Sequence, residues 1–157
     1  KAGERVPSAT LKQMTKDGPQ NVTTDQLFAG RKVALFSVPG AFTPTCHAKH
    51  LPGYLEHHDA LKAKGVDAIA CLAVNDVFVM DAWGKASGAG DKVTMLADGN
   101  ADFTRALGLE LDASGFGMGT RGKRFAMIVN DGVVLHLNVE AAGEFRVSAA
   151  DYVLGQL

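Results

Sequence analysis

The sequence predicts an α/β fold, with a mixed β-sheet flanked by helices and a β-hairpin at the N-terminus. Two runs of strand-forming residues, 32–38 and 66–74, are separated by helix-forming sequence, and such a crossover makes the two strands parallel. Two apolar runs around Asn130-Asp131-Gly132 are typical of an antiparallel hairpin. The sheet is therefore expected to contain both parallel and antiparallel strands.

The N-terminal part of the chain is expected to form the first hairpin. Residues 8–14 and 20–24 have weak strand patterns, and the turn-forming sequence Lys16-Asp17-Gly18-Pro19 lies between them. A helical turn at 24–28 should follow and end at Gly30. The next strand, 32–38, is rich in strand formers and is expected to be buried.

A helix is predicted to start at Pro44, directly after this strand. Thr43 precedes a proline and is therefore pushed out of the helical region, so the helix cannot begin earlier. Pro44 suits the first helical position, and Thr43 is the natural N-cap. Pro52 should kink the helix near 51–53, and the sequence 62–65 is typical of a helix end.

The rest of the chain continues this alternation. The apolar run 66–74 is too continuous for a half-exposed strand and is expected at the centre of the sheet. The remaining elements are expected, in chain order, as a helix at 77–86 capped by Asp76, a strand at 93–96, a helix at 101–107, a glycine-rich loop with one helical turn at 108–122, strands at 124–129 and 133–139, and a C-terminal helix opened by Ser148 and Asp151. This order matches a thioredoxin-like fold. No linker or repeat interrupts it, so residues 1–157 are expected to form a single domain.

The composition excludes several classes of function. The chain has 157 residues, a net charge of −1, 46% hydrophobic and 21% charged residues, which is ordinary for a soluble globular protein. Without a basic block, no nucleic-acid partner is expected, and the longest apolar runs are strand-sized, so no membrane span is expected. Two cysteines are too few for a disulfide scaffold and fit a reducing, cytoplasmic location. There is no initiator methionine, so export or organelle import stays open if a leader was removed.

The most informative residue is Cys46, which the predicted helix places at its third position. Backbone N–H groups are unpaired there and the helix dipole is positive, so the nucleophilic thiolate is favoured. Lowering a thiol pKa by about three units requires roughly 4 kcal/mol, whereas a helix N-terminus supplies about 0.3–2 kcal/mol. The sequence therefore predicts that a cation from a distant part of the chain approaches Cys46. A lone cysteine is more often buried and inert, but the neighbouring prolines and the N-cap favour the reactive interpretation.

Two motifs around this cysteine resemble a known family. The pattern Pro39-xxx-Thr43-xx-Cys46 matches the peroxiredoxin signature, and the string 38–46 with His50-Leu51-Pro52-Gly53 resembles the peroxiredoxin 5 or type II (atypical) subfamily, within the thioredoxin-like superfamily. The likeness covers nearly the whole chain and extends through Val74-Asn75-Asp76, Ala82-Trp83-Gly84, Leu96-Ala97-Asp98, Lys123-Arg124-Phe125 and Leu137-Asn138-Val139-Glu140.

The resemblance implies a thiol-dependent peroxidase that reduces hydrogen peroxide and organic (alkyl) hydroperoxides in antioxidant defence and redox homeostasis, without a cofactor. Cys46 would attack the O–O bond as a thiolate and become a sulfenic acid. Thr43 would hydrogen-bond the thiolate and the peroxide, Pro39 would shield the sulfur, and Arg124 would be the expected cation. Arg121 and Lys123 are nearby alternatives from the residues alone, and the resemblance selects Arg124. It also assigns supporting or substrate-binding positions to His50, Gly40, Phe42 and Thr45.

The sulfenic acid is expected to be reduced by an external thiol. Cys71 lies in the predicted central strand, where structural burial is expected, although its spacing from Cys46 resembles plant-like type II members in which it is considered as a resolving partner. Animal-like members carry a resolving cysteine where this chain has Val147, so that disulfide cannot form here. Glutathione with glutaredoxin, or thioredoxin, is the expected reductant, and the resemblance implies a homodimer.

The sequence bears on three other interpretations. Cys46 and His50 are four residues apart, a spacing that can place two metal ligands on one side of a helix, but no other Cys or His motif completes a set and no metal is expected. A peroxide sensor or redox relay with little turnover would need the same residues as the peroxidase. Residue 49 is a lysine, so the Cys-x-x-Cys motif of a disulfide reductase is missing.

Overall fold

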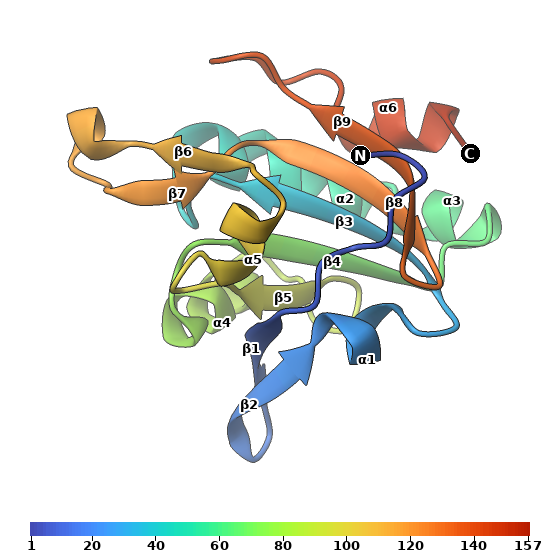
Figure 1. Ribbon diagram of the computed structural model, residues 1–157, viewed down its shortest axis with the longest axis horizontal. Coiled ribbons are helices and arrows are strands. Elements are labelled where there is room, and N and C mark those ends of the chain that lie inside the picture. The colour runs from blue at the N-terminus through green and yellow to red at the C-terminus, as the bar shows by residue number, and fades with distance from the viewer.

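A seven-stranded mixed β-sheet forms the centre of the computed structural model, which describes residues 1–157 (Figure 1). The strand order is β2-β1-β5-β4-β3-β8-β9, and β6 and β7 pair with each other apart from this sheet. In chain order, the strands are β1 (Thr10–Thr15), β2 (Gly18–Thr23), β3 (Lys32–Val38), β4 (Ala68–Ala73), β5 (Thr94–Ala97), β6 (Glu110–Asp112), β7 (Thr120–Gly122), β8 (Phe125–Asn130) and β9 (Val133–Val139). The helices are α1 (Thr24–Phe28), the π-helix η1 (Cys46–His50), α2 (Leu51–Glu56), α3 (His58–Ala63), α4 (Val77–Ala86), α5 (Asp102–Ala106), the 3-10 turn η2 (Ser114–Phe116) and α6 (Ala150–Gly155).

The three central strands are parallel, as the helical crossovers predict. β4 pairs in parallel with β3 on one side and with β5 on the other, and its residues from Ile69 to Ala73 are buried. β3 also pairs antiparallel with β8. Because both faces of these strands are covered, their sequences are almost continuously apolar. The predicted α/β, thioredoxin-like arrangement is confirmed.

Helices cover both faces of the sheet and bury two separate hydrophobic clusters. The cluster on one face combines sheet residues with side chains of α2, α3, α4 and α6, and its largest buried members include Trp83 and Tyr54. The cluster on the other face contains side chains of α1 and α5, among them Phe28 and Phe103. Cys46 belongs to the first cluster, so the first cluster surrounds the predicted reactive residue.

Both predicted hairpins are present, and the structure identifies the residues that form their turns. In the N-terminal hairpin Thr15 faces Gly18, so the turn is tighter than the predicted one, and Gly18 adopts a φ of +99°. In the C-terminal hairpin the two turn residues, Asp131 and Gly132, have φ values of 49° and 81°. Left-handed conformations at both positions are what a two-residue hairpin turn requires, so the prediction from Asn130-Asp131-Gly132 is confirmed.

The glycine-rich segment 108–122 is predicted from the sequence to be a loop with one helical turn, but it also contains two short strands. Its ends form the short hairpin β6–β7, in which Glu110 faces Gly122 and Asp112 faces Thr120, and Figure 1 shows this hairpin extending beyond the end of the sheet. Most of its residues are exposed or half-buried. A strand with no buried face carries little hydrophobic alternation, which is the signal that identifies strands from sequence. The predicted helical turn is present at Ser114–Phe116.

The predicted kink at 51–53 is wrong in its position, because the helix is distorted before Pro52. Pro44 and Thr45 are helical, and the next five residues form the π-helix η1, in which the N–H group of Leu51 donates to the carbonyl oxygen of Cys46. A proline ring in a regular helix collides with the carbonyl four residues earlier, here that of Ala48, and cannot donate to it. We attribute the wider π turn to this conflict. The helix is also divided at His57, which separates α2 from α3.

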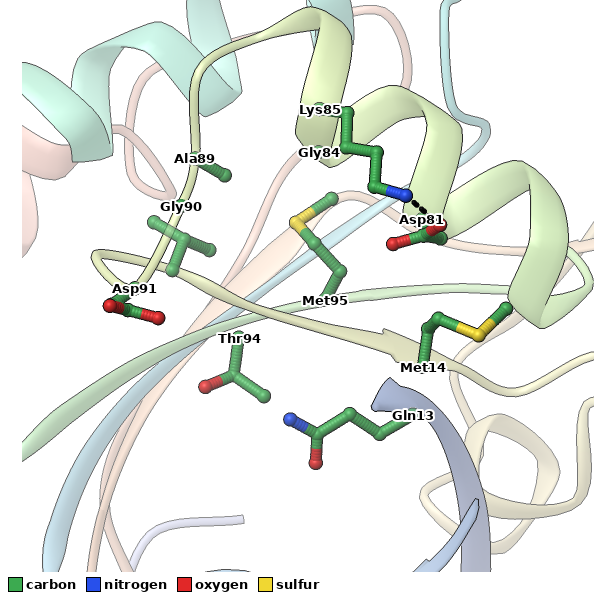
Figure 2. A pocket seen from close by; sticks show the side chains of 11 residues that line it. Gln13, Met14, Asp81, Gly84, Lys85, Ala89, Gly90, Asp91, Thr94 and Met95 are labelled. Atoms are coloured by element: carbon green, nitrogen blue, oxygen red, sulfur yellow. Dashed lines mark ion pairs between the residues drawn. The ribbon is translucent and has the colours of Figure 1, made fainter. Parts of the chain in front are cut away.

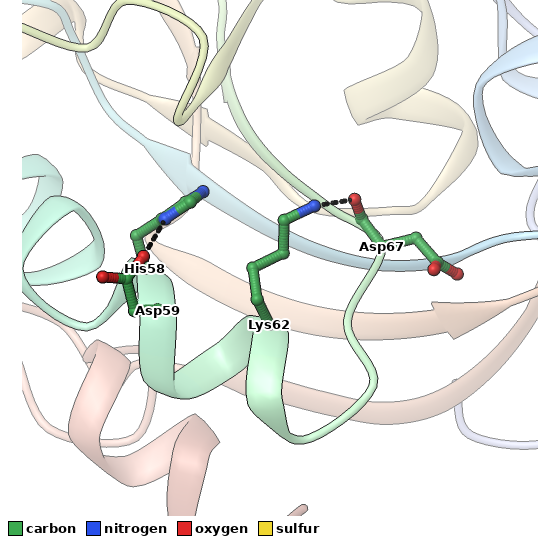
Figure 3. Close-up of polar contacts among 4 residues, drawn as sticks. All are labelled: His58, Asp59, Lys62 and Asp67. Atoms are coloured by element: carbon green, nitrogen blue, oxygen red, sulfur yellow. Dashed lines mark hydrogen bonds and ion pairs between the residues drawn. The ribbon is translucent and has the colours of Figure 1, made fainter.

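Polar contacts hold the return from α3 into β4 (Figure 3). The Lys62 ammonium donates to the carbonyl oxygen of Asp67, and the Asp67 carboxylate accepts from the N–H group of Lys32 at 2.8 Å. Gly65 has a φ of +95°, which fits the predicted helix end at 62–65. Within α3, His58 Nδ1 lies 3.0 Å from the Asp59 carboxylate.

The three predicted helix caps have different outcomes. Thr43 precedes the helix, as predicted, but its hydroxyl donates to the carbonyl oxygen of Gly40 and makes no cap hydrogen bond to the helix. The Asp76 carboxylate accepts from the N–H group of Val79 at 2.8 Å and caps α4, as predicted. The C-terminal helix α6 starts at Ala150 without a side-chain cap, so the cap predicted for Ser148 is wrong. The Ser148 hydroxyl instead donates to the Glu140 carboxylate at 2.6 Å. None of the helices combines the length and hydropathy needed to cross a membrane.

Candidate active site

Cys46 is the third helical residue after β3, which is the position that the sequence predicts. Pro44 and Thr45 are the first two helical residues, and the N–H group of His47 closes the first turn by donating to the carbonyl oxygen of Thr43 at 2.8 Å. The Cys46 side chain has no exposed surface. A buried thiol at this position needs a polar partner to become ionised.

Arg124 supplies that partner. It directly precedes β8, and because Ser37 of β3 faces Phe125 of β8, Arg124 lies beside the end of β3 from which the helix departs. Its Nη2 donates to Cys46 Sγ at 3.0 Å, and its Nη1 lies 2.8 Å from His50 Nδ1. The predicted cation from a distant part of the chain is therefore in contact with the sulfur.

His50 is buried and neutral, and its hydrogen bonds define its tautomer. Burial, followed by the charge of Arg124, lowers the pKa of His50 to about 3, although the hydrogen bond to Ser148 opposes this shift. His50 Nε2 lies 3.1 Å from the carbonyl oxygen of Ser148, which can only accept, so Nε2 carries the proton. Nδ1 is then the acceptor for the N–H group of Arg124.

Aromatic rings enclose this polar group. The Phe36 and Phe145 rings lie 4.8 Å and 5.0 Å from the His50 ring, and the Arg124 guanidinium carbon is 5.8 Å from the centroid of the Phe145 ring. This distance suits a cation–π contact. The rings limit the access of water to the guanidinium, which strengthens its interaction with Cys46.

A hollow of about 540 Å³ lies next to the buried sulfur. Its lining includes Pro39, Thr45 and Arg124, the apolar side chains of Leu111, Phe116 and Phe145, and the charged residues Lys123, Glu140 and Glu144. It thus reaches three residues predicted from the sequence, and Arg124 belongs to both the hollow and the contact with Sγ.

The loop before the helix is held by several hydrogen bonds. The Thr43 hydroxyl donates to the carbonyl oxygen of Gly40 at 2.6 Å, so its oxygen keeps free lone pairs. The N–H group of Ala41 donates to the side-chain oxygen of Asn75 at 2.9 Å. Arg121 Nη1 donates to the carbonyl oxygen of Pro39 at 3.4 Å. A Cβ atom at Gly40 would lie 3.0 Å from Thr43 Cγ2 and 3.1 Å from Arg121 Nη1, so this position has little room for a side chain.

Phe42 lies at the surface, outside this hollow. It has a φ of 63° and is 48% exposed. Its ring is 5.7 Å from the ring of His47 and 6.4 Å from that of Trp83, and Trp83 Nε1 donates to His47 Nδ1 at 3.0 Å. The structure therefore places Phe42 with α4 and with the exposed side of the π-helix.

Cys71 is fully buried in the middle of β4, where it faces Phe36 of β3 and Met95 of β5. Burial, and then the nearby Cys46, raises the pKa of Cys71 well above its ordinary value. Both cysteines are free thiols. The burial expected for Cys71 is thus observed, and its thiol is in the protonated, unreactive form.

Sequence reasoning missed the roles of four polar residues that hold the site in place. They are Asn75, Glu140, Ser148 (predicted to open a helix) and Arg121 (an alternative cation). Asn75 and Glu140 belong to motifs that carried the resemblance, but nothing in the sequence indicated what they contact. The Cys46 and His50 pair, whose spacing could suit two metal ligands, is contacted by an arginine. The sulfur and Nδ1 both accept from Arg124, whose positive charge opposes a metal cation there.

A second hollow, of about 380 Å³, lies between α4 and strands β1 and β5 (Figure 2). It is lined in part by Met14, Met95 and the Asp81–Lys85 ion pair of α4, in which Lys85 Nζ is 3.0 Å from Asp81 Oδ2. None of the site residues predicted from the sequence lines it, so it is not part of the candidate active site.

Comparisons with known proteins agree with this site. The family model described as Redoxin matches residues 1–154. The chain is 52% identical over 160 residues to "Peroxiredoxin-2E-2, chloroplastic" of Oryza sativa subsp. japonica, a match covering 99% of this chain and 71% of that protein. Among solved structures, reduced Prx3 in complex with H2O2 from Vibrio vulnificus has a TM-score of 0.96 and 56% identity, covering 99% of this chain and 98% of that chain. Peroxiredoxin 5 from Alvinella pompejana has a TM-score of 0.87 and 38% identity, covering 98% and 95%.

Proposed function

Because the chain belongs to the peroxiredoxins of the Redoxin family, we propose that Cys46 is the residue that reacts with the peroxide. Peroxiredoxins are thiol peroxidases of antioxidant defence, and this chain is such an enzyme. One observation carries the assignment to Cys46, namely the 3.0 Å hydrogen bond from Arg124 Nη2 to its sulfur. A guanidinium stays charged at all relevant pH values, so it stabilises a thiolate in a site that otherwise excludes charge.

The proposed reaction is nucleophilic displacement at oxygen. The Cys46 thiolate attacks the terminal oxygen of the hydroperoxide, an S–O bond forms and the O–O bond breaks. The sulfur is oxidised to sulfenic acid, and the departing oxygen takes up a proton and leaves as water or an alcohol. Arg124 stabilises the negative charge as it moves from sulfur to the departing oxygen.

The other predicted residues take supporting roles in this proposal. The Thr43 hydroxyl donates a hydrogen bond to the carbonyl oxygen of Gly40, so its own oxygen can accept a hydrogen bond from the peroxide. Pro39 and Thr45 line the hollow through which the peroxide reaches the sulfur, and Pro39 shields that sulfur from water. His50 orients Arg124, and Gly40 leaves room for the close approach of Thr43. The proposed substrates are hydrogen peroxide, in line with the peroxide complex of the Vibrio relative, and alkyl hydroperoxides that suit the apolar lining.

We further propose that an external thiol reduces the sulfenic acid. Cys71 is fully buried in the central strand, and its raised thiol pKa disfavours the thiolate that would have to attack the sulfenic acid. Glutathione with glutaredoxin, or thioredoxin, supplies the reducing thiol in this proposal. The two free thiols fit a reducing compartment such as the cytoplasm.

The proposed enzyme is a single domain of residues 1–157 that forms a homodimer. Both core clusters are built on the same sheet, which favours one domain. Exposed aromatic side chains favour a partner surface: Phe42, Phe78 and Phe116 are 48%, 65% and 86% exposed, and large exposed aromatic groups are typical of interfaces.

Peroxide consumption with defined thiol donors tests this function. Wild type, Cys46→Ser and Cys71→Ser are compared with glutathione plus glutaredoxin and with thioredoxin plus its reductase. Cys46→Ser should lose turnover, and Cys71→Ser should keep most of it. Loss of turnover in Cys71→Ser to the level of Cys46→Ser would overturn the external-thiol mechanism. Rapid oxidation of Cys46 without turnover by any donor would instead indicate a peroxide sensor.

A further inference from the structure

A carboxylate beyond the first contacts of the site organises the segment that follows β9. Glu140 directly follows β9, and its Oε2 accepts three hydrogen bonds, from the N–H group of Arg146 at 2.7 Å, the N–H group of Ser148 at 2.8 Å and the hydroxyl of Ser148 at 2.6 Å. Residues 141–144 between them are exposed. The carboxylate thus ties the far end of an exposed loop to the end of the strand.

The tied end of this loop carries a backbone oxygen that points into the site. The carbonyl oxygen of Ser148 lies 3.1 Å from His50 Nε2 and accepts from the Tyr54 hydroxyl at 2.8 Å. Burial, and then the negative charges of the Asp151 and Glu140 carboxylates, raises the pKa of Tyr54 well above its ordinary value, so its hydroxyl keeps its proton. Ser148 is fully buried, and both donors depend on where its carbonyl is held.

The position of this carbonyl decides which atom of His50 faces Arg124. With its proton on Nε2 and directed at Ser148, the imidazole offers an unprotonated Nδ1 to Arg124 Nη1 at 2.8 Å. The same guanidinium contacts Cys46 Sγ through Nη2. Since a guanidinium is planar and rigid, fixing one nitrogen fixes the direction of the other.

We propose that Glu140 is a positioning residue for the Arg124 guanidinium, which it orients at Cys46 through the Ser148 carbonyl and the His50 imidazole. This inference rests on the proposed function of Cys46 and Arg124. Glu140 makes no hydrogen bond to the Cys46 sulfur and would act on it through other residues.

The hydrogen bonds of Glu140 link it to His50 through Ser148, and Glu140 also lines the hollow beside Arg124. Its carboxylate forms no ion pair with Arg124, since the ion pairs of the molecule join other residues. The backbones of the two residues meet where the N–H group of Glu140 donates to the carbonyl oxygen of Arg124 at 3.0 Å. Burial alone would raise the pKa of Glu140, but the hydrogen bonds from Ser148, Arg146 and Val147 outweigh it and the pKa is lowered. The carboxylate is therefore charged at neutral pH and strengthens the bonds that hold the loop.

The test compares the full-length wild-type protein with Glu140→Ala and Glu140→Gln. The measurements are the rate constant for oxidation of Cys46 by hydrogen peroxide, the pH dependence of alkylation of Cys46 by iodoacetamide, and the urea midpoint of unfolding. Glu140→Ala should slow oxidation by about tenfold, the effect of weakening about one charge-assisted hydrogen bond. The pH midpoint of alkylation should rise by about half a unit or more, because a loosely held guanidinium favours the thiolate less. Glu140→Gln keeps the shape of the side chain and should show the same changes at smaller size.

A double-mutant cycle tests whether the effect passes through His50. His50→Asn keeps a side-chain oxygen near Nδ1 for Arg124 but cannot reach the Ser148 carbonyl. In that background, Glu140→Ala should slow oxidation by less than about threefold, because the connection is already cut. Equal effects of Glu140→Ala in both backgrounds would overturn the proposal. So would a lower urea midpoint in both Glu140 variants with an unchanged pH midpoint, which is the pattern of a purely structural role.

A matched control and the two cysteine variants separate this proposal from the proposed function. Glu56→Gln removes the same charge from an exposed side chain of α2 and should change none of the three measurements. If Cys46→Ser consumed peroxide as fast as wild type, the proposed function would fall. If Cys46 is essential and Glu140→Ala and Glu140→Gln leave its oxidation rate and pH midpoint unchanged, the positioning role alone is wrong.

Discussion

Arg124 and Cys46 are 78 positions apart in the sequence, and their side chains are joined by a hydrogen bond of 3.0 Å from Nη2 to Sγ. The second nitrogen of the same guanidinium holds His50 at 2.8 Å. One planar group thus serves the sulfur of the first helical turn and the imidazole of the next. The planarity of Arg124, as well as its charge, is therefore expected to matter.

Replacement of Arg124 by lysine tests that expectation. Lysine keeps the charge, but a single ammonium nitrogen cannot occupy both guanidinium positions. Losing one charge-assisted hydrogen bond costs about 1.5–3 kcal/mol, so kcat/KM for hydrogen peroxide should fall roughly 10- to 150-fold in stopped-flow measurements. Arg105→Lys, on an exposed residue of α5, is the matched control. A decrease smaller than threefold for Arg124→Lys would show that charge alone is sufficient.

Gly40→Ala should reduce peroxidase activity through a steric effect. The added Cβ atom would lie 3.0 Å from Thr43 Cγ2 and 3.1 Å from Arg121 Nη1, so Thr43 has to move away from its place beside the helix. A displacement of about 1 Å at a reacting centre can reduce the rate about 100-fold. Steady-state kinetics with hydrogen peroxide measure the effect, and Gly115→Ala, where a Cβ atom meets nothing within 4 Å, is the control. Equal activities of the two variants would contradict the steric argument.

Cys71 should resist alkylation in the folded protein. Its side chain is fully buried, and burial raises the pKa of its thiol, so little thiolate forms at neutral pH. Brief treatment of the reduced protein with iodoacetamide at pH 7, followed by peptide mass spectrometry, should find label on Cys46 before Cys71. In a denaturing concentration of urea, both cysteines should react. Labelling of Cys71 at the same rate as Cys46 in the folded protein would show that β4 opens readily.

Acid should destabilise the fold through His50. The folded pKa of this group is about 3, below its ordinary value of 6.5, so below pH 6.5 the unfolded chain binds a proton that the folded chain rejects. The free energy of unfolding should therefore fall as the pH falls from about 6.5 toward 3, by about 2 kcal/mol at pH 5 from this group.

Urea unfolding between pH 5 and 7.5 measures this dependence. His50→Asn should flatten it, since asparagine does not titrate. The lowered pKa of Glu140 removes stability only as the pH falls below its ordinary value of 4.5, so it does not affect this range. An equal slope for wild type and His50→Asn would rule out the buried imidazole as the cause.

The parts of this molecule that local chemistry determines could be predicted from the sequence. The start of the helix at Pro44 follows from proline geometry, and the position of Cys46 follows from counting. The turn at Asp131 and Gly132 follows from the residues that tolerate a positive φ. The energetic shortfall of the helix dipole also indicated that a cation was needed, while only the resemblance distinguished Arg124 from Arg121 and Lys123. In the structure Arg121 holds the loop of Pro39 instead.

The parts that depend on distant contacts could not be predicted. Ser148 looks like a helix cap in sequence, but its hydroxyl is used by Glu140, and no local pattern reveals such a competitor. The hairpin β6–β7 lacks a buried face, so it lacks alternation. The widened turn at Cys46–His50 arises from a conflict between Pro52 and a preceding carbonyl, whereas sequence rules place the distortion at the proline itself.

Because of the π-helix, the direction in which the Cys46 thiol points depends on the number of residues in this turn as well as on their identity. Leu51 and Tyr54 anchor the following helix in the core, so a change of chain length upstream must be absorbed on the Cys46 side. Each residue of a regular helix advances the winding by about 100°. Deleting Ala48 would therefore rotate the Cys46 side of the helix relative to the core by about 100° and swing the thiol away from the guanidinium, with every site side chain still in the chain.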